Sequence, residues 1–132
     1  MKTRMFRRSL LVLGGLLLSA AAMAQGRVLY LENCAACHGF YGGGDGPVAP
    51  VLVVGVPDLR RLSVRSEGTY PDQWVRRVID GREQIPSHGD RYMPVWGSEF
   101  WLREGGDEQA EQEVRRRIQD LVDYLATIQL TD

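Results

Sequence analysis

Two cysteines and a histidine share five consecutive positions, Cys34-Ala35-Ala36-Cys37-His38, and this cluster constrains the chain more than any other feature. Such spacing is used by a redox-active dithiol, by part of a zinc site, and by a haem attached covalently through both thiols. Each of the three chemistries needs different surroundings. The remainder of the sequence therefore bears on the choice between them.

The first 24 residues have the pattern of an export signal. Four basic residues, beginning with Lys2, precede an apolar run that ends on Ala22-Met23-Ala24, the small-residue pattern of a signal-peptidase site. We expect a signal peptide over 1–24 and a single periplasmic domain over 25–132. The alternative is a retained membrane anchor, but the uncharged stretch is only 16 residues long. Crossing a bilayer takes about 20 residues.

Removing the leader makes the remaining domain acidic. The leader holds four of the 16 basic residues and none of the 17 acidic residues, which leaves 12 against 17. Nucleic-acid-binding proteins carry a basic footprint, so this balance argues against a nucleic-acid partner. Lys2 is the only lysine of the sequence, and the basic side chains of the exported domain are therefore arginines.

The surroundings of the cluster favour haem over the other two chemistries. A thioredoxin-like disulfide needs a βαβ unit, and no alternating strand pattern surrounds Cys34. Zinc needs four ligands, and the cysteines and histidines available are Cys34, Cys37, His38 and His88. Adjacent Cys37 and His38 fit one tetrahedral ion poorly. Haem meets neither difficulty, because two thiols attach to its vinyl groups and the histidine reaches the iron.

If His38 binds the iron from one side, Met93 is the best candidate for the opposite side. It is the one methionine after the leader, and in RYMPVWG the ring of Pro94 extends the residue before it, which presents the thioether from a loop. His88 lies in the polar turn SHGD and is interpreted as a surface histidine. A thioether opposite an imidazole raises the reduction potential, which suits an electron carrier.

The pattern along the chain is all-α, with three main helices. We expect a first helix over about residues 27–36, a second between Pro71 and Gly81, and a last helix of about 20 residues capped by Asp107. A short helix is expected from Ser98. The glycine-rich stretch after Phe40 is expected to be a loop and not a phosphate cradle, because no strand precedes it.

The apolar stretch VLVVGVPDL, residues 51–59, is cut by Gly55 and Pro57. We therefore interpret it as a buried loop that lines something hydrophobic, and not as a strand. Long irregular connections are unusual in a compact domain unless they serve a function. A haem in the centre of the domain would provide one.

With these residues in place, the chain resembles the class I c-type cytochromes, small single-haem electron carriers, in their bacterial periplasmic form. The resemblance extends over nearly all of residues 26–129 and includes the attachment motif, from Cys34 to His38. It also includes the sixth-ligand loop YMPVWG around Met93 and Trp96. It implies the cytochrome c fold with one covalent haem c, its iron held by His38 and Met93, and Trp96 beside the cofactor.

Further positions agree with this family. Gly26 and Tyr30 correspond to first-helix residues that pack across the last helix there, against the counterparts of Leu121 and Tyr124. The family also has a proline whose carbonyl oxygen accepts the hydrogen bond of the imidazole Nδ1, followed by a leucine against the haem.

Pro50 and Leu52 match that proline and leucine in their distance from His38. The two residues are therefore assigned to the cofactor site by the resemblance.

The resemblance implies an electron carrier without catalytic residues, monomeric, exchanging electrons with other redox proteins. Without lysines, any electrostatic steering falls to arginines such as Arg60, Arg61 and Arg91, or to acidic patches. Two alternatives stay open: a subunit held stably by a periplasmic oxidoreductase, and a haem enzyme or sensor whose sixth iron position is open. The sequence identifies neither the donor nor the acceptor.

Overall fold

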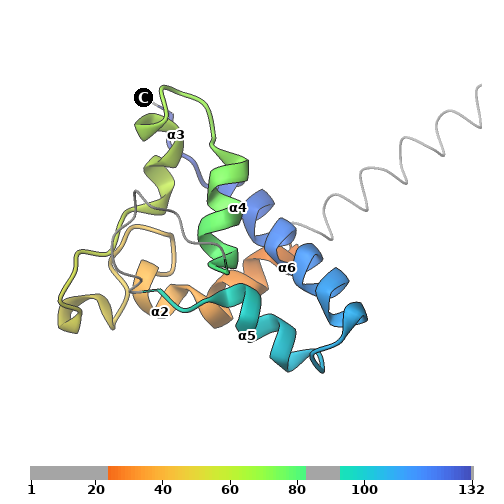
Figure 1. The fold of residues 1–132 in the computed structure, drawn as a ribbon. Coiled ribbons are helices and arrows are strands. Elements are labelled where there is room, and N and C mark those ends of the chain that lie inside the picture. The colour runs from red at the N-terminus through yellow and green to blue at the C-terminus, as the bar shows by residue number, and fades with distance from the viewer. Residues whose placement is uncertain (1–23, 83–92, 132) are drawn as a thin grey trace, which may run out of the picture.

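The computed structural model describes residues 24–82 and 93–131 (Figure 1). Within these ranges every regular element is helical, which confirms the all-α expectation. Residues 24–33 are helical and lead through a turn at Cys34 into α2, Ala35–His38. The later elements are η1 (Ala49–Val51), η2 (Leu59–Arg61), α3 (Leu62–Arg65), α4 (Asp72–Asp80), α5 (Trp96–Arg103) and α6 (Glu108–Thr127).

The core is organised around α6. The Asp107 carboxylate accepts a hydrogen bond from the Ala110 backbone N–H at 2.8 Å and caps the helix, as expected. The face of α6 turned inward carries the buried apolar residues Ala110, Val114, Ile118, Leu121, Val122, Tyr124 and Leu125. Both α4 and α5 pack against this helix and against each other. They contribute the buried side chains of Val75, Ile79 and Phe100.

The helix over residues 24–33 crosses α6 at close range (Figure 1). A Cβ placed on Gly26 would lie 2.1 Å from the carbonyl oxygen of Asp120, so only glycine permits this approach. Next to it, the rings of Tyr30 and Tyr124 pack with their centroids 5.2 Å apart, and Leu121 is buried. The packing expected for these four residues is therefore confirmed.

Two helix boundaries differ from the expected ones. The first helix is described from residue 24 and breaks at residue 34, before the expected end at 36, because the attachment motif forms a separate turn, α2. Helix α5 begins at Trp96, two residues before Ser98. Gly97 favours no helix on its own, but a Cβ there would lie 2.2 Å from Asp80 Oδ1, so tertiary contact with the end of α4 decides its conformation.

Between η1 and η2, residues 52–58 are irregular, as expected, but the first part of the stretch 51–59 is not buried. Val51 and Val53 are 79% and 92% exposed, and Leu52 is 38% exposed. The reason is that the buried core cluster, built on α6, contains no residue of this stretch, and of its residues only Leu59 packs against the cluster. The short helices η2 and α3, which were not expected from the sequence, carry the chain from this loop to α4.

Residues 1–23 of the proposed leader lie outside the described residues, as do His88 and Arg91. Among the helices that the structure describes, none is both long and apolar enough to cross a membrane.

Candidate functional site

The attachment motif is held by the glycine-rich loop that follows it. Three carbonyl oxygens at the C-terminal end of α2 accept hydrogen bonds from this loop: Gly44 N–H donates to His38 O at 2.8 Å, Gly46 N–H to Cys37 O at 3.1 Å, and Val48 N–H to Ala36 O at 3.0 Å. These oxygens would otherwise lack partners, because a helix leaves its last carbonyls unpaired. The loop is therefore a cap for the motif, and not a phosphate cradle.

Close packing explains the glycines of that loop. A Cβ placed on Gly46 would lie 2.4 Å from Ala36 O and 2.6 Å from Cys37 O, so the loop backbone lies directly on the motif. The hydroxyl of buried Tyr30 donates a 2.6 Å hydrogen bond to Gly39 O and joins the first helix to the same turn. The C-terminal end of the motif is thereby fixed.

The imidazole of His38 is oriented by a backbone carbonyl. Its Nδ1 lies 3.3 Å from the carbonyl oxygen of Pro57. Burial lowers the pKa of His38, and the bond to Pro57 partly offsets this, so the ring is neutral at pH 7. A neutral ring that donates from Nδ1 keeps the lone pair of Nε2 free to bind a metal. A half-buried ring in this state can bind a metal through Nε2.

The acceptor was assigned to Pro50 by resemblance, and that assignment is wrong: Pro57 provides the carbonyl. Pro50 instead lies inside η1, and Leu52 caps that short helix with 38% of its surface exposed. The sequence repeats the Pro-x-Leu pattern seven residues later, at Pro57 and Leu59. Only the second copy is brought to His38, because the N–H of Leu59 donates a 2.7 Å hydrogen bond to Gly42 O and folds the loop back.

Cys34 and Cys37 are free thiols, both half-buried, on the turn that ends at His38. Burial, with a smaller effect of Cys37, raises the pKa of the Cys34 thiol to about 12. No cluster of three or more histidine, cysteine or carboxylate side chains converges on a metal-sized point within the described ranges. Both thiols and the imidazole of His38 thus lie within one short stretch of backbone, Cys34 to His38.

Met93 and Trp96 stand at the entrance to α5. Met93 is half-buried, and Trp96 is the first residue of the helix. The indole of Trp96 stacks on the ring of buried Phe100, with the centroids 5.6 Å apart and the planes inclined by 29°. The Arg103 guanidinium lies 6.0 Å from both centroids and donates a 3.0 Å hydrogen bond to Asn33 Oδ1, next to Cys34. Arg103 therefore connects the helix after Met93 to the helix before the motif.

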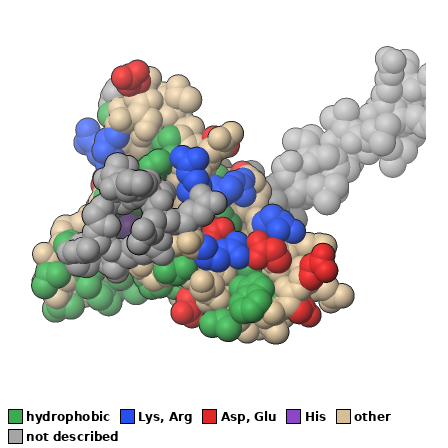
Figure 2. Space-filling model, in the orientation of Figure 1, with side chains coloured by type: hydrophobic (Ala, Val, Ile, Leu, Met, Phe, Trp, Pro, Cys, Tyr) green, Lys and Arg blue, Asp and Glu red, His purple; other side chains and the backbone are tan. Residues whose placement is uncertain are grey.

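Exposed apolar side chains accompany the motif. Phe40, Tyr41, Val48, Val51, Leu52 and Val53 all belong to the connection between α2 and η2 and are all exposed. Figure 2 shows hydrophobic side chains gathered at the lower left of the molecule, where Figure 1 places the yellow-to-olive loop around η1. This apolar surface fits a large apolar cofactor or an apolar partner surface better than it fits water.

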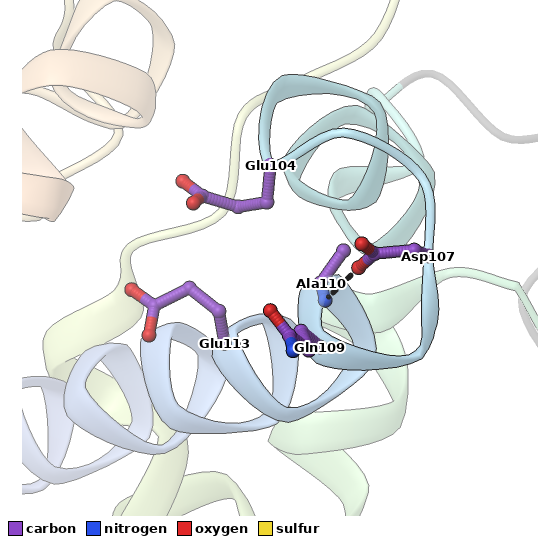
Figure 3. A pocket seen from close by; sticks show the side chains of 5 residues that line it. All are labelled: Glu104, Asp107, Gln109, Ala110 and Glu113. Carbon is purple, nitrogen blue, oxygen red and sulfur yellow. Dashed lines mark hydrogen bonds between the residues drawn. The ribbon is translucent and has the colours of Figure 1, made fainter.

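A hollow at the other end of the molecule carries no comparable chemistry. It has a volume of about 240 Å³ and is lined by Glu104, Asp107, Gln109, Ala110 and Glu113 (Figure 3). The Asp107 carboxylate caps α6, and the Arg117 guanidinium pairs with both Glu104 and Glu113. These carboxylates therefore serve the structure of α6.

Comparison with known proteins agrees with this geometry. The family described as cytochrome c oxidase, cbb3-type, subunit III matches residues 21–104, which include the attachment motif, Met93 and Trp96. The chain belongs to this family of c-type cytochromes. No curated protein and no solved structure matches it. Members of the family bind haem c covalently, so haem-based electron transfer is the activity of this cytochrome.

The residues of this cytochrome fit that group. Two free thiols could form its thioethers, the Nε2 of His38 could bind the iron, and apolar side chains border the motif. When bound, the haem supplies one-electron chemistry, as its iron alternates between the ferrous and ferric states.

Proposed function

We propose that this cytochrome is a periplasmic electron carrier with one haem per chain, in which Cys34 and Cys37 are the thioether anchors and His38 and Met93 the axial ligands. The observation that carries the proposal is the pairing of His38 Nδ1 with Pro57 O at 3.3 Å. It holds the ring in one orientation and in the tautomer that leaves Nε2 available. In this proposal Trp96 borders the cofactor and Leu52 approaches it from the exposed loop after η1, whereas Pro57 and Leu59 form the Pro-x-Leu copy that is brought to His38. Residues 1–24 are a cleaved signal peptide, and 25–132 form the domain.

Each chain residue has a limited task in this function. The thioethers would prevent loss of the cofactor, and the hydrogen bond from Nδ1 to Pro57 O would hold the imidazole of His38 in one orientation. The thioether of Met93 favours ferrous iron and places the potential in the range of an electron carrier. A site that changes little on electron transfer needs little reorganisation, which favours fast exchange with partner proteins.

The optical spectrum of the protein, produced in a host that attaches haem, tests the ligand set. We expect a covalent haem that stays on the chain in a denaturing gel, and a weak red band from sulfur bound to ferric iron. Met93→Ala should abolish that band and lower the potential, whereas His88→Ala should retain both. Replacing Cys34 and Cys37 together by alanine should abolish covalent attachment. A wild-type chain without covalent haem would sink the proposal.

The family description favours a second function, that of a subunit bound stably to an oxidase. Size-exclusion chromatography of native extracts separates the two. A free carrier elutes near the 14.8 kDa of the whole chain or below it, and a subunit elutes with its complex. An enzyme or sensor with an open iron position would bind carbon monoxide rapidly in the ferrous state, whereas a carrier with Met93 on the iron would not.

A further inference from the structure

The segment that carries Met93 leaves α4 and returns at α5, and its two ends touch. A Cβ on Gly81 would lie 3.3 Å from Val95 Cα, and a Cβ on Gly97 would lie 2.8 Å from Asp80 O. The two backbones thus approach closely where Gly81 faces Val95 and where Gly97 faces Asp80. We call residues 80–82 and 95–97 together the stem. Met93 is separated from the stem by Pro94 alone. The position of the stem therefore limits where the thioether can be.

Arg82 holds one side of this stem to two helices. Its guanidinium makes a two-pronged contact with Asp80, at the end of α4, from Nε at 2.6 Å and Nη2 at 2.9 Å. It makes a second such contact with Glu111, in the first turn of α6, from Nη1 at 2.6 Å and Nη2 at 3.0 Å. All three side chains are only about one-third exposed, at 33%, 28% and 31%.

This arrangement stabilises the stem more than an ordinary surface ion pair would. Paired N–H donors from one planar guanidinium fix the direction as well as the distance of the contact. A lysine ammonium is a single point of charge and cannot make such a paired contact with each of the two carboxylates. The carboxylate of Asp80 at the C-terminus of α4 also faces the negative end of the helix dipole, which Arg82 compensates. Gly97 completes the contact, since a Cβ there would lie 2.7 Å from Arg82 Nε.

We propose that Arg82 is a positioning residue for the sixth iron ligand: by joining the stem to α4 and α6 it keeps the thioether of Met93 on the iron. The inference rests on the proposed function, since it takes Met93 as that ligand. Arg82 does not touch the iron; it acts through the stem. Loss of the guanidinium loosens the stem and lets an external ligand compete for the iron.

The test is the binding of imidazole to the ferric protein with its haem attached. Arg82→Gln should raise the affinity for imidazole about tenfold, the factor expected for losing roughly 1.4 kcal/mol of ligand positioning. Arg82→Lys should give a smaller rise in imidazole affinity, because lysine keeps the positive charge but lacks the planar pair of N–H donors. The weak red band of the sulfur–iron bond should shrink in the same order.

Arg116→Gln is the matched control. Arg116 also makes a two-pronged contact, with Glu113 at 2.9 and 2.5 Å, and pairs with Asp120 at 2.7 Å, but all of these lie on α6 away from the stem. It should change imidazole affinity less than twofold. If Arg82→Gln does not retain its haem, Glu111→Gln is tested in its place, because that variant keeps the contact between Arg82 and Asp80. It too should raise the affinity for imidazole, and no rise would overturn the proposal.

The outcomes separate the two proposals. A wild type with the red band whose Arg82→Gln variant binds imidazole no more tightly overturns the role of Arg82 alone. Equal rises in Arg82→Gln and Arg116→Gln overturn it as well, since they indicate general loosening of α6. A wild type without the band overturns Met93 ligation and, with it, the role of Arg82.

Discussion

The Nδ1 of His38 lies 3.3 Å from the carbonyl oxygen of Pro57, and the residue after that proline is itself anchored. The Asp58 carboxylate caps η2 by accepting the Arg60 N–H at 2.9 Å, and it pairs with the Arg60 guanidinium at 2.8 Å. Arg65 donates a 2.9 Å hydrogen bond to Asp58 O. The peptide that orients the imidazole is therefore fixed by contacts outside the cofactor site.

Asp58→Ala should raise the reduction potential. Loosening the peptide weakens the hydrogen bond from Nδ1, which makes the imidazole a poorer donor to ferric iron. A bond worth about 1 kcal/mol limits the rise to roughly 40 mV for one electron. Redox titration of the protein with its haem attached measures the rise.

Asp58→Asn separates the hydrogen bond from the charge, because asparagine also caps helices but carries no charge. We expect a smaller rise for Asp58→Asn than for Asp58→Ala. Equal rises in reduction potential for both variants would mean that loss of the carboxylate charge, and not loss of the peptide's orientation, causes the rise. Glu67→Gln, a charge change at an exposed turn residue, should leave the potential unchanged.

Gly26→Ala should destabilise the fold by about 1–3 kcal/mol, the usual cost of overpacking. The added methyl group would meet the Asp120 carbonyl oxygen at 2.1 Å and force the first helix away from α6. Denaturant unfolding of the protein with its haem measures the loss. Gly55→Ala is the control, because a Cβ there has no neighbour within 4 Å. A similar loss in both variants would contradict the assigned role of the helix crossing.

The stability of α6 should fall in acid through Glu113. Hydrogen bonds from Arg116, and then from Arg117, lower the pKa of this carboxyl to about 2. A depressed folded-state pKa stabilises the fold above the unfolded pKa and stops doing so as pH falls through the folded one. Facing groups that share this network are Glu104, through Arg117, and Asp120, through Arg116.

We expect the wild type to lose its Glu113 contribution between about pH 4.5 and pH 2, where an unfolded glutamate and then the folded one take up protons. Glu113→Gln should be less stable than wild type at pH 7 and approach it at pH 2. Free energies of unfolding at both values measure the difference. A constant difference across this range would rule out the ionised form as the source.

Much of the fold follows from local signals. Apolar residues three and four positions apart and the Asp107 cap predict helix α6. Pro71 before the helix and Gly81 after it, where the backbone is left-handed with φ 67°, predict α4. These signals act within one or two turns, so the sequence alone contains them. The attachment motif is equally local, because both thiols and the histidine lie on one turn.

The rest of the fold and of the candidate site depends on contacts between residues that are distant in the sequence. Choosing Pro57 over Pro50 requires knowing that Leu59 bonds to Gly42, and both prolines fit the local pattern. The two-pronged contact of Arg82 with Glu111 could not be predicted for the same reason, since the two residues lie 29 positions apart in the sequence. The exposed valines show a third limit: apolar composition predicts burial, but it does not say against what a side chain is buried.

The crossing at Gly26 also fixes an order of events during synthesis. Gly26 precedes the two cysteines, whereas its partner Asp120 belongs to the last helix described, so the ribosome delivers them far apart in time. Until α6 has been made, the segment with both thiols lacks the surface that holds it. Covalent attachment at Cys34 and Cys37 should therefore be easier in a chain whose last helix has not yet packed, because the segment with the thiols is then not held against α6.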